Sequence, residues 1–587
     1  MMRYAAIALT FVLVACSGAQ PPDPDEPSNP AGIVIYPAAL VVPMTGDDQR
    51  AEAVAVQQGR ILALGTLSEL SAAFPAATTD DVFADKVILP GLIDPHMHVL
   101  LGAMMYGQPF AAPWPMAGPD GMRPGYPTRE TFLQRVAELV AVAPPDGSPI
   151  VIYGYHNLVQ GTLNRDDLDA INDQRPIIVW HYSGHDFYLN SPALDMVGAD
   201  PSWADTWHGI GLTAEGRLNG RIYEDAALQI FSQLAGVLMS PDAMSRGLGS
   251  YFDILRNSGV TTTAELGYGI FGRAYEDAAI TTYWGSPEAS GFHLYLVPEY
   301  RALGRDFGDG GPAAVADMVA GDIAVPAPVL PRVKFFTDGA FYSQTMRLSP
   351  PGYLAGQSEG TSGLWVMPPD QRLQILEPYA DAGFAVHIHS NGDAAQDATL
   401  DALQSLRESG FDEDFVIEHG GLFSPQQVDR AADLGASVSV ASHYVFYMAP
   451  NYADPLGPAR ARWISPVNSL TRAGVAVALH SDAPLAPPIP LRAAGAHVTR
   501  LTRLGGSYMP DEALTPYDAL ESITLDAARV LGLDDEIGSL DVGKRADFTV
   551  LEANPLETDP EAWATIGVWG VLLDGVVRPR HEGVEAP

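Results

Sequence analysis

The sequence contains little cysteine and few basic residues for its length. Cys16 is the only cysteine among 587 residues, so no disulfide can form within the chain and no zinc–thiolate site can be built. Lysine and arginine together number 33 against 71 acidic residues, which gives a formal net charge of −38. This excess of negative charge argues against nucleic acid and anionic lipid surfaces as partners. After the first 20 residues, no apolar run resembles a transmembrane segment.

Residues 1–15 have the features of a targeting segment. Arg3 precedes the apolar stretch from Ala5 to Val14, and the letters LVAC then end at Cys16. This run resembles the lipobox of bacterial lipoproteins, which implies cleavage before Cys16 and lipidation of its thiol. Because Ser17 is not the aspartate associated with inner-membrane retention, the outer membrane is favoured, on the periplasmic or cell-surface side. An ordinary signal peptide or a chance cysteine is the alternative.

A segment rich in proline and acidic residues follows the targeting signal. Residues 20–31 read QPPDPDEPSNPA, a composition that cannot bury a core and is expected to be extended and disordered. We therefore assign residues 1–15 to a lipoprotein signal peptide and residues 16–31 to a disordered tether. Several acyl chains on Cys16 would hold the protein firmly on a membrane, since a single chain binds only marginally.

Strand-like apolar runs divided by glycine, proline and aspartate occur near both ends of the remaining chain. Gly59-Arg60 is typical of a hairpin turn between two such runs, and Asp574-Gly575 forms a similar pair near the C-terminus. We therefore expect residues 32–87 and 537–587 to build one small composite β-sandwich together.

The middle of the chain, residues 88–536, alternates strand-like and helical segments. This is the rhythm of a parallel sheet with crossover helices, and nearly every strand ends in polar residues followed by glycine or proline. The fold class that fits best is α/β, a (β/α)8 TIM barrel with its chemistry at the carboxyl ends of the strands. The region from about 101 to 330 is long for the early strands and predicts inserted loops or a small lid subdomain.

The stretch ILPGLIDPHMH, residues 88–98, contains the first candidate metal ligands. Strand side chains alternate between faces, so His96 and His98 point the same way. Two imidazoles on one face at a strand end can share one metal ion. The alternative is a pair of ordinary histidines in a buried turn.

A lysine occupies a later strand. The run RVKFFTDG, residues 332–339, places Lys334 among apolar neighbours. A buried unpaired lysine is costly, so its amine is expected to be deprotonated, paired or chemically modified. The alternative is a lysine at the edge of a strand.

Three further strand ends carry histidine or aspartate. The runs FAVHIHSNGD and FVIEHG contain His387, His389 and His419 near their carboxyl ends. The run VAVALHSD places His480 and Asp482 on one face, with Asp482 at the mouth of the barrel. Each residue alone is more often a satisfied polar group than a ligand. Their order at successive strand ends favours a metal site.

Nine stretches, which together span nearly the whole mature chain, resemble one known family. They are PGLIDPHMH, HDFYLNSPAL, GRLNGRIYE, SGVTTTAE, VKFFTDGA, HIHSNGDAAQDATLDAL, IEHGGLFS, LHSDAPLAP and the closing run TPYDALESITLDAARVLGLDDEIGSLDVGKRADFTVLEANP. The sequence is similar to the amidohydrolase superfamily, in its amidohydrolase-3 branch of YtcJ-like proteins and N-substituted formamide deformylases. This resemblance implies a metal-dependent hydrolase on a (β/α)8 barrel with a composite β-sandwich.

The resemblance also implies a ligand set, residue by residue: His96 and His98 on the first strand, Lys334 on the fourth, His389 and His419 on the fifth and sixth, and Asp482 on the eighth. In related enzymes the lysine can be carboxylated and bridge two metals. His387 shares a strand face with His389 and is an alternative ligand, although the His-x-x-Gly-Asp pattern favours His389. Histidine and carboxylate suit Zn²⁺ but also Mn²⁺, Fe²⁺ or Co²⁺, so we expect one or two divalent ions, with zinc preferred.

These residues suit hydrolysis of a carbon–nitrogen bond in an amide, formamide or cyclic amide by metal-activated water. Asp482 would accept the proton of the water and pass it to the leaving amine. His419 or His185 would hold the developing oxyanion. We also place His185 and Glu224 near the substrate pocket, because both lie in family-like stretches, with an ordinary loop histidine as the alternative for His185.

Three other functions stay open from the sequence. A lipid-anchored binding protein could keep the barrel without turnover, and esters or carbamates could replace amides as substrates. A glycoside hydrolase would use paired carboxylates, for which Glu265 and Glu418 are the only hints. In every case the partner is a small molecule and not a nucleic acid, and a homo-oligomer is compatible with the sequence.

Overall fold

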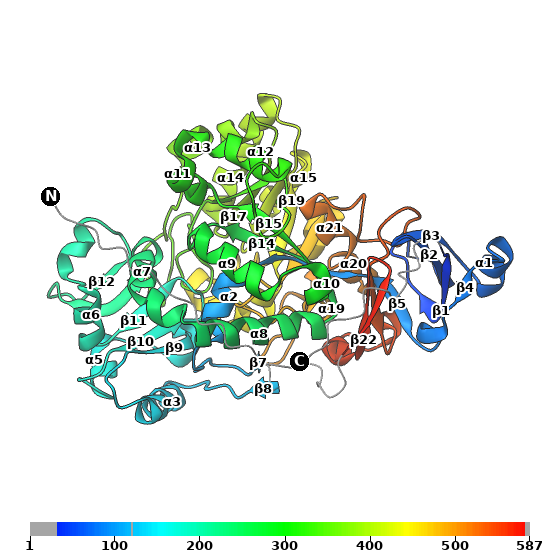
Figure 1. Ribbon diagram of the computed structural model, residues 1–587. Helices are drawn as coiled ribbons and strands as arrows, with labels where there is room; N and C mark the ends of the chain where they lie inside the picture. Colours follow the sequence, from blue (N-terminus) through cyan, green and yellow to red (C-terminus); the bar gives the residue numbers. More distant parts are fainter. Residues whose placement is uncertain (1–31, 48, 119–120, 581–587) are drawn as a thin grey trace.

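The computed structural model describes residues 32–47, 49–118 and 121–580 of the chain. Cys16, together with the signal peptide and tether assigned from the sequence, lies outside the described residues. No helix within the described ranges is long and apolar enough to cross a membrane. Figure 1 shows a core of parallel strands in the centre, a sheet made from both chain ends on one side and an inserted module on the other.

Strands from both ends of the chain share one sheet, with the order β23-β22-β21-β5-β1-β2-β3 and β4 paired to β1. The two ends meet where β21 pairs antiparallel with β5. The strands are β1 (Val34–Val41), β2 (Ala51–Gln57), β3 (Arg60–Gly65), β4 (Thr78–Thr79), β5 (Val87–Pro90), β21 (Phe548–Leu551), β22 (Val568–Leu573) and β23 (Val576–Pro579).

This composite sheet differs in two details from the expected sandwich. Its strands form one continuous hydrogen-bonded path instead of two sheets, because β2 pairs with one edge of β1 while the other edge pairs first with β4 and then with β5. The sheet also extends to Pro90, past the boundary expected at residue 87. The chain leaves it at Gly91, where a Cβ would lie 2.0 Å from Thr261 Oγ1, so the close approach requires glycine.

Eight described strands of the middle region are parallel and follow the order of the chain. They form a three-stranded sheet, β15-β14-β6, and a five-stranded sheet, β16-β17-β18-β19-β20. Single parallel bridges, Met97–Ala483 and Glu299–Lys334, lie where the two sheets adjoin. This is an α/β arrangement of the TIM-barrel type. The strands are β6 (Leu92–Met97), β14 (Val260–Tyr268), β15 (His293–Pro298), β16 (Arg332–Phe336), β17 (Ala385–Ser390), β18 (Phe415–His419), β19 (Ser437–Ala441) and β20 (Val477–His480).

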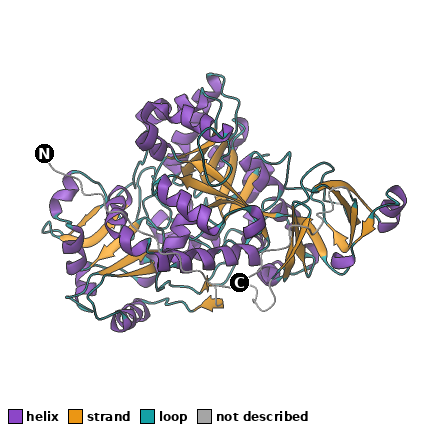
Figure 2. Cartoon of the chain, viewed as in Figure 1, coloured by secondary structure: helices purple, strands orange, loops and turns teal. Residues whose placement is uncertain are grey.

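Helices cover the outside of these strands (Figure 2). In α14, the buried residues Ala395, Thr399, Leu403 and Leu406 recur every three or four positions, which gives the helix one face that packs on the core. The principal covering helices are α8 (Pro241–Asn257), α9 (Arg273–Tyr283), α11 (Tyr300–Phe307), α12 (Gly311–Ala320), α13 (Pro369–Ala380), α14 (Asp393–Glu408), α15 (Pro425–Asp433), α18 (Val467–Arg472), α19 (Pro490–Thr499), α20 (Pro516–Glu521) and α21 (Leu525–Leu531).

An inserted module separates β6 from β14 and occupies the first part of the range in which the sequence predicts insertions. Its five-stranded sheet has the order β12-β13-β11-β10-β9. In Figure 1 this sheet lies at the opposite end of the molecule from β1, β2 and β3. The elements are α2 (Val99–Tyr106), β7 (Met116–Gly118), β8 (Gly121–Arg123), α3 (Arg129–Val142), β9 (Ile150–Tyr155), β10 (Ile177–His181), β11 (Asp186–Leu189), β12 (Ile210–Leu212) and β13 (Leu218–Tyr223).

Candidate metal centre

The carboxyl ends of the parallel strands enclose a cavity of about 50 Å³. Its walls include every metal ligand that the sequence predicts, and they also include His185 from the inserted module. The elements that carry these side chains are β6 for His96, the N-cap of α2 for His98, β16 for Lys334, β17 for His389, β18 for His419 and the turn after β20 for Asp482. The strand-end pattern therefore does bring these residues together.

Asp482 lies at the centre of the group. One carboxylate oxygen, Oδ1, is 3.5 Å from His96 Nε2 and 3.4 Å from His98 Nε2. The other, Oδ2, is 3.6 Å from His419 Nδ1. Ligand atoms placed about 2.0–2.1 Å from a tetrahedral ion are about 3.4 Å from one another, so these separations fit atoms arranged around one ion.

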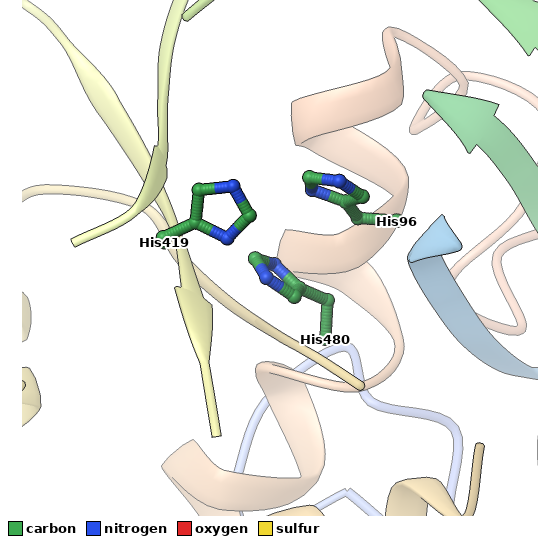
Figure 3. Close-up of side chains that lie close together, drawn as sticks. All are labelled: His96, His419 and His480. Atoms are coloured by element: carbon green, nitrogen blue, oxygen red, sulfur yellow. The ribbon is translucent and has the colours of Figure 1, made fainter. Parts of the chain in front are cut away.

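His480 is a fourth histidine near this group, and it is not among the ligands expected from the sequence. Figure 3 shows its ring facing those of His96 and His419. The ring centroids of His480 and His96 are 4.5 Å apart, and the potential ligand atoms of all three histidines lie within 4.8 Å of one another. His480 Nδ1 is 2.6 Å from Ser439 Oγ, which leaves Nε2 as its remaining ring nitrogen. The signal was present in the sequence, since His480 shares a strand face with Asp482.

Two buried carboxylates contact the Nδ1 atoms of the first pair of histidines, His96 and His98. His96 Nδ1 is 2.7 Å from Glu418 Oε2, and His98 Nδ1 is 2.9 Å from Glu265 Oε1. A carboxylate that accepts a hydrogen bond from one ring nitrogen fixes the tautomer and leaves the lone pair of the other nitrogen for a metal. Both glutamates therefore take part in the histidine network and do not stand free as a catalytic pair of a glycoside hydrolase.

The position of Glu418 could not be read from its sequence neighbours. Successive strand residues normally face opposite sides, which would separate Glu418 from His419. His419 has a φ of 74°, in the left-handed region, at the last position of β18. This conformation lets both side chains reach the same cluster.

Several buried polar atoms of this cluster have no hydrogen-bond partner among the described residues: His96 Nε2, Lys334 Nζ, His419 Nδ1 and His480 Nε2. An unsatisfied buried polar group costs roughly 1–3 kcal/mol, so four such atoms at one place require an explanation. Nitrogen and carboxylate donors around one point are the ligands of a divalent cation. The residues present therefore fit a metal ion.

Lys334 is fully buried in β16, so it is not the strand-edge lysine that was the alternative. Burial lowers the pKa of its amine to about 8, even though nearby carboxylates such as Glu418 and Asp482 oppose that shift. The amine is therefore partly neutral near pH 8.

The two histidines of β17 have different surroundings. His387 Nδ1 is 2.6 Å from Glu418 Oε1, and His387 is not among the residues that line the cavity. His389 lines the cavity, and its ring centroid lies 4.5 Å from that of His419. His389 Nε2 is 3.1 Å from the carbonyl oxygen of Gly339.

His185 faces the cavity from the inserted module, with Glu224 behind it. His185 Nδ1 is 3.0 Å from Glu224 Oε2, and Glu224 Oε1 accepts a hydrogen bond from the Thr345 hydroxyl. Burial alone would raise the pKa of Glu224, but the charge and hydrogen bond of His185 lower it to about 2. Burial opposes protonation of His185, yet the Glu224 carboxylate raises the pKa of its imidazole. The pair therefore favours the charged form of both groups.

A second group of potential ligands lies between β15 and the composite sheet. His293 Nε2 is 3.2 Å from Asp574 Oδ2 and 3.6 Å from Asp547 Oδ2. Arg545 Nη2 is 2.7 Å from the same Asp547 oxygen. This group includes a guanidinium, whereas the group around Asp482 does not.

Comparison with known proteins gives consistent results. A profile described as the amidohydrolase family matches residues 84–579, and one described as an imidazolonepropionase-like composite domain of bacteria matches residues 53–77. N-substituted formamide deformylase of Arthrobacter pascens is 27% identical over 91% of this chain and 96% of its own length. The provisionally named amidohydrolase YtcJ of Bacillus subtilis (strain 168) is 23% identical over 92% of this chain and 98% of its own length.

One solved structure has the same architecture. The crystal structure of an uncharacterized metal-dependent hydrolase from Pyrococcus horikoshii OT3 aligns with a TM-score of 0.66 at 19% identity, over 90% of this chain and 99% of that one. At this level of identity, the similarity supports the fold.

Proposed function

Since this chain is a member of the amidohydrolase family, we propose that it hydrolyses an amide, formamide or cyclic amide at the cavity around Asp482. Its class, a metal-dependent hydrolase that acts on carbon–nitrogen bonds of small molecules, follows from the family and its relatives. The observation that carries the assignment of the site is the convergence of His96, His98 and His419 on Asp482, with unpartnered nitrogens turned inwards.

We assign His96, His98, Lys334, His389, His419 and Asp482 as the metal ligands. The cavity-lining position of His389 and the engagement of His387 by Glu418 favour His389 as the ligand on β17. The donor set suits zinc, although Mn²⁺, Fe²⁺ and Co²⁺ have overlapping preferences. The bridges at Met97 and Glu299 support closure of the two parallel sheets into a complete (β/α)8 barrel.

A bound divalent ion would lower the pKa of a water molecule and polarise the scissile carbonyl. Asp482 is placed to accept the proton of that water: burial raises its pKa, but its contacts with His98 and the other nearby histidines outweigh burial and keep the carboxyl group ionised. The same carboxyl group would then return the proton to the leaving nitrogen. The His185 imidazolium, oriented by Glu224, would donate a hydrogen bond to the developing oxyanion.

Lys334 suits carboxylation, because its buried amine is unpartnered and its pKa is about 8. The neutral amine would attack CO2, form an N–C bond and release one proton, which gives a carbamate with two oxygens for two ions. Lys334→Ala should then lose one of two bound ions, and bicarbonate should speed reactivation of metal-stripped wild type. A wild type with a single ion and no response to bicarbonate would contradict the carbamate.

The size of the cavity favours a small acyl group. Its volume of about 50 Å³ is far below the roughly 300–1,000 Å³ of usual small-molecule pockets. We therefore expect turnover to fall from N-formyl to N-acetyl to N-benzoyl derivatives of one amine, measured as kcat/KM. A preference for the N-benzoyl substrate would contradict this assignment.

Metal-stripped and metal-loaded protein compared on this panel would separate an enzyme from a binding protein on the same fold. The enzyme should lose turnover with the metal and recover it on reloading. Hydrolysis of matched esters or carbamates faster than amides would instead favour the alternative substrates.

We propose that the mature protein is anchored to a bacterial membrane through lipid on Cys16, on the periplasmic or cell-surface side. The support is the LVAC run and the tether after it. Cys16→Ser should release the protein into the soluble fraction or block its processing. A wild-type protein found in the cytoplasm with Met1 intact would contradict the anchor.

A further inference from the structure

A second and larger cavity, of about 690 Å³, opens beside the end of α2. It shares no lining residue with the cavity around Asp482. Its walls come from the last residue of α2, the loop that follows, the end of β8, α3 and α8. Pockets for small ligands are usually about 300–1,000 Å³, so the volume suits a small molecule.

The cavity is lined by several arginines, although the chain as a whole is strongly acidic. Arg123, Arg135 and Arg246 line it, whereas the chain has 71 acidic and only 33 basic residues. The one acidic lining residue is Asp253, and Arg256 forms an ion pair with it. Arg135 also pairs with Glu138 at 3.7 Å, and the lining residues themselves comprise three arginines against one aspartate.

Aromatic rings hold two of these guanidinium groups. The Arg123 guanidinium carbon is 4.5 Å from the ring centroid of Phe110, and that of Arg135 is 5.4 Å from the ring centroid of Tyr126. A guanidinium stacked on a ring keeps a fixed plane, and its N–H groups match a carboxylate or phosphate in that plane.

We propose that this cavity is a second binding site, for a small organic anion that carries a carboxylate or phosphate on a flat apolar body. Arg123, Arg135 and Arg246 bind the anionic group. The rings of Phe110 and Tyr126 contact the flat body. Binding at this cavity requires no catalysis, so this proposal can be tested independently of the proposed hydrolase activity.

The test uses isothermal titration calorimetry on the purified protein with three probes: benzoate, inorganic phosphate and the uncharged benzyl alcohol. Wild type should bind benzoate most tightly and benzyl alcohol not at all. Arg123→Ala with Arg246→Ala should raise the Kd for benzoate by roughly tenfold or more, as expected for the loss of charge-assisted hydrogen bonds. Arg129→Ala is the matched control, because Arg129 lies on α3 outside the cavity and pairs with Asp167.

A second control separates this site from the metal centre, which could also bind a carboxylate. The variant with His96→Ala and His98→Ala should keep the wild-type affinity for benzoate. Circular dichroism and thermal unfolding establish that each variant is folded. Loss of benzoate binding in this histidine variant would overturn the proposal, as would wild-type affinity in the arginine variant or no binding of benzoate by wild type. Equal affinity for phosphate and benzoate would overturn the assignment of a flat organic body.

Discussion

Two groups of histidine and aspartate in this molecule bring three potential metal ligands within reach of one another, yet they differ in what surrounds them. Around Asp482, the outer ring nitrogens of His96 and His98 are held by glutamates and the inner ones point to a common centre. Around His293, the guanidinium of Arg545 already occupies the space beside the carboxylate of Asp547.

The difference shows that the distance between ligand atoms is not enough to identify a metal site. A cation cannot easily join a group whose carboxylates are already neutralised by arginine, and Asp574 is partly open to solvent. His293 Nε2 is also a buried nitrogen without a hydrogen-bond partner, so the feature that separates the two groups is the Arg545 guanidinium paired with Asp547. The His293 group is better explained as an ion network that joins β15 to the composite sheet.

The largest effect is expected when two ligands of the Asp482 group are removed. His96→Ala with His98→Ala should lose metal and activity together, because too few donors remain to hold the ion. His293→Ala is the matched control and should keep both. Elemental analysis beside hydrolysis of N-formyl and N-acyl substrates measures the contrast, and a double variant that keeps its metal and its turnover would refute the site.

The next effect in size concerns the proposed base. Asp482→Asn keeps the shape and hydrogen bonding of the side chain but removes its basicity, so kcat should fall by a factor of about 10² to 10⁴ while much of the metal stays bound. Asp547→Asn at the other group should leave kcat unchanged. Metal content and turnover should be measured on the same samples. Unchanged turnover in Asp482→Asn would exclude Asp482 as the general base.

A smaller effect should follow from the carboxylate behind His96. Glu418→Gln removes the charge that orients two histidines, and the loss of such an outer partner typically weakens metal affinity by about 10- to 100-fold. Competition with a chelator measures the affinity. Glu552→Gln, at an exposed ion pair with Lys86, is the control, and equal affinities in the two variants would show that Glu418 plays no part.

The smallest effect should come from the His293 group. His293→Ala removes contacts to two aspartates, one of them partly exposed, so the free energy of unfolding should fall by no more than about 1 kcal/mol. Thermal unfolding of apoprotein and metal-loaded protein measures the change. A loss that appears only after metal loading would mean that this group also binds an ion.

Particular residues show how far the sequence determined this protein. The alternation of strand side chains places His96 and His98 on one face, and the order of polar strand ends predicts that His389, His419 and Asp482 meet them. The apolar runs at both ends of the chain likewise predict a shared β unit. Each run can bury its apolar face only by packing against another β segment. These features are local patterns that short-range geometry converts directly into structure.

Other features depended on tertiary structure. The left-handed backbone at His419 lets Glu418 reach His96, and the inserted module carries His185 to the cavity, with Glu224 against its Nδ1. The arginine-lined cavity joins α2, α3 and α8, whose sequences show no common motif. Such contacts join residues far apart in the chain through packing, which local periodicity does not encode. The sequence therefore determined which residues stand at the strand ends, and only the packing of distant segments decided what supports them.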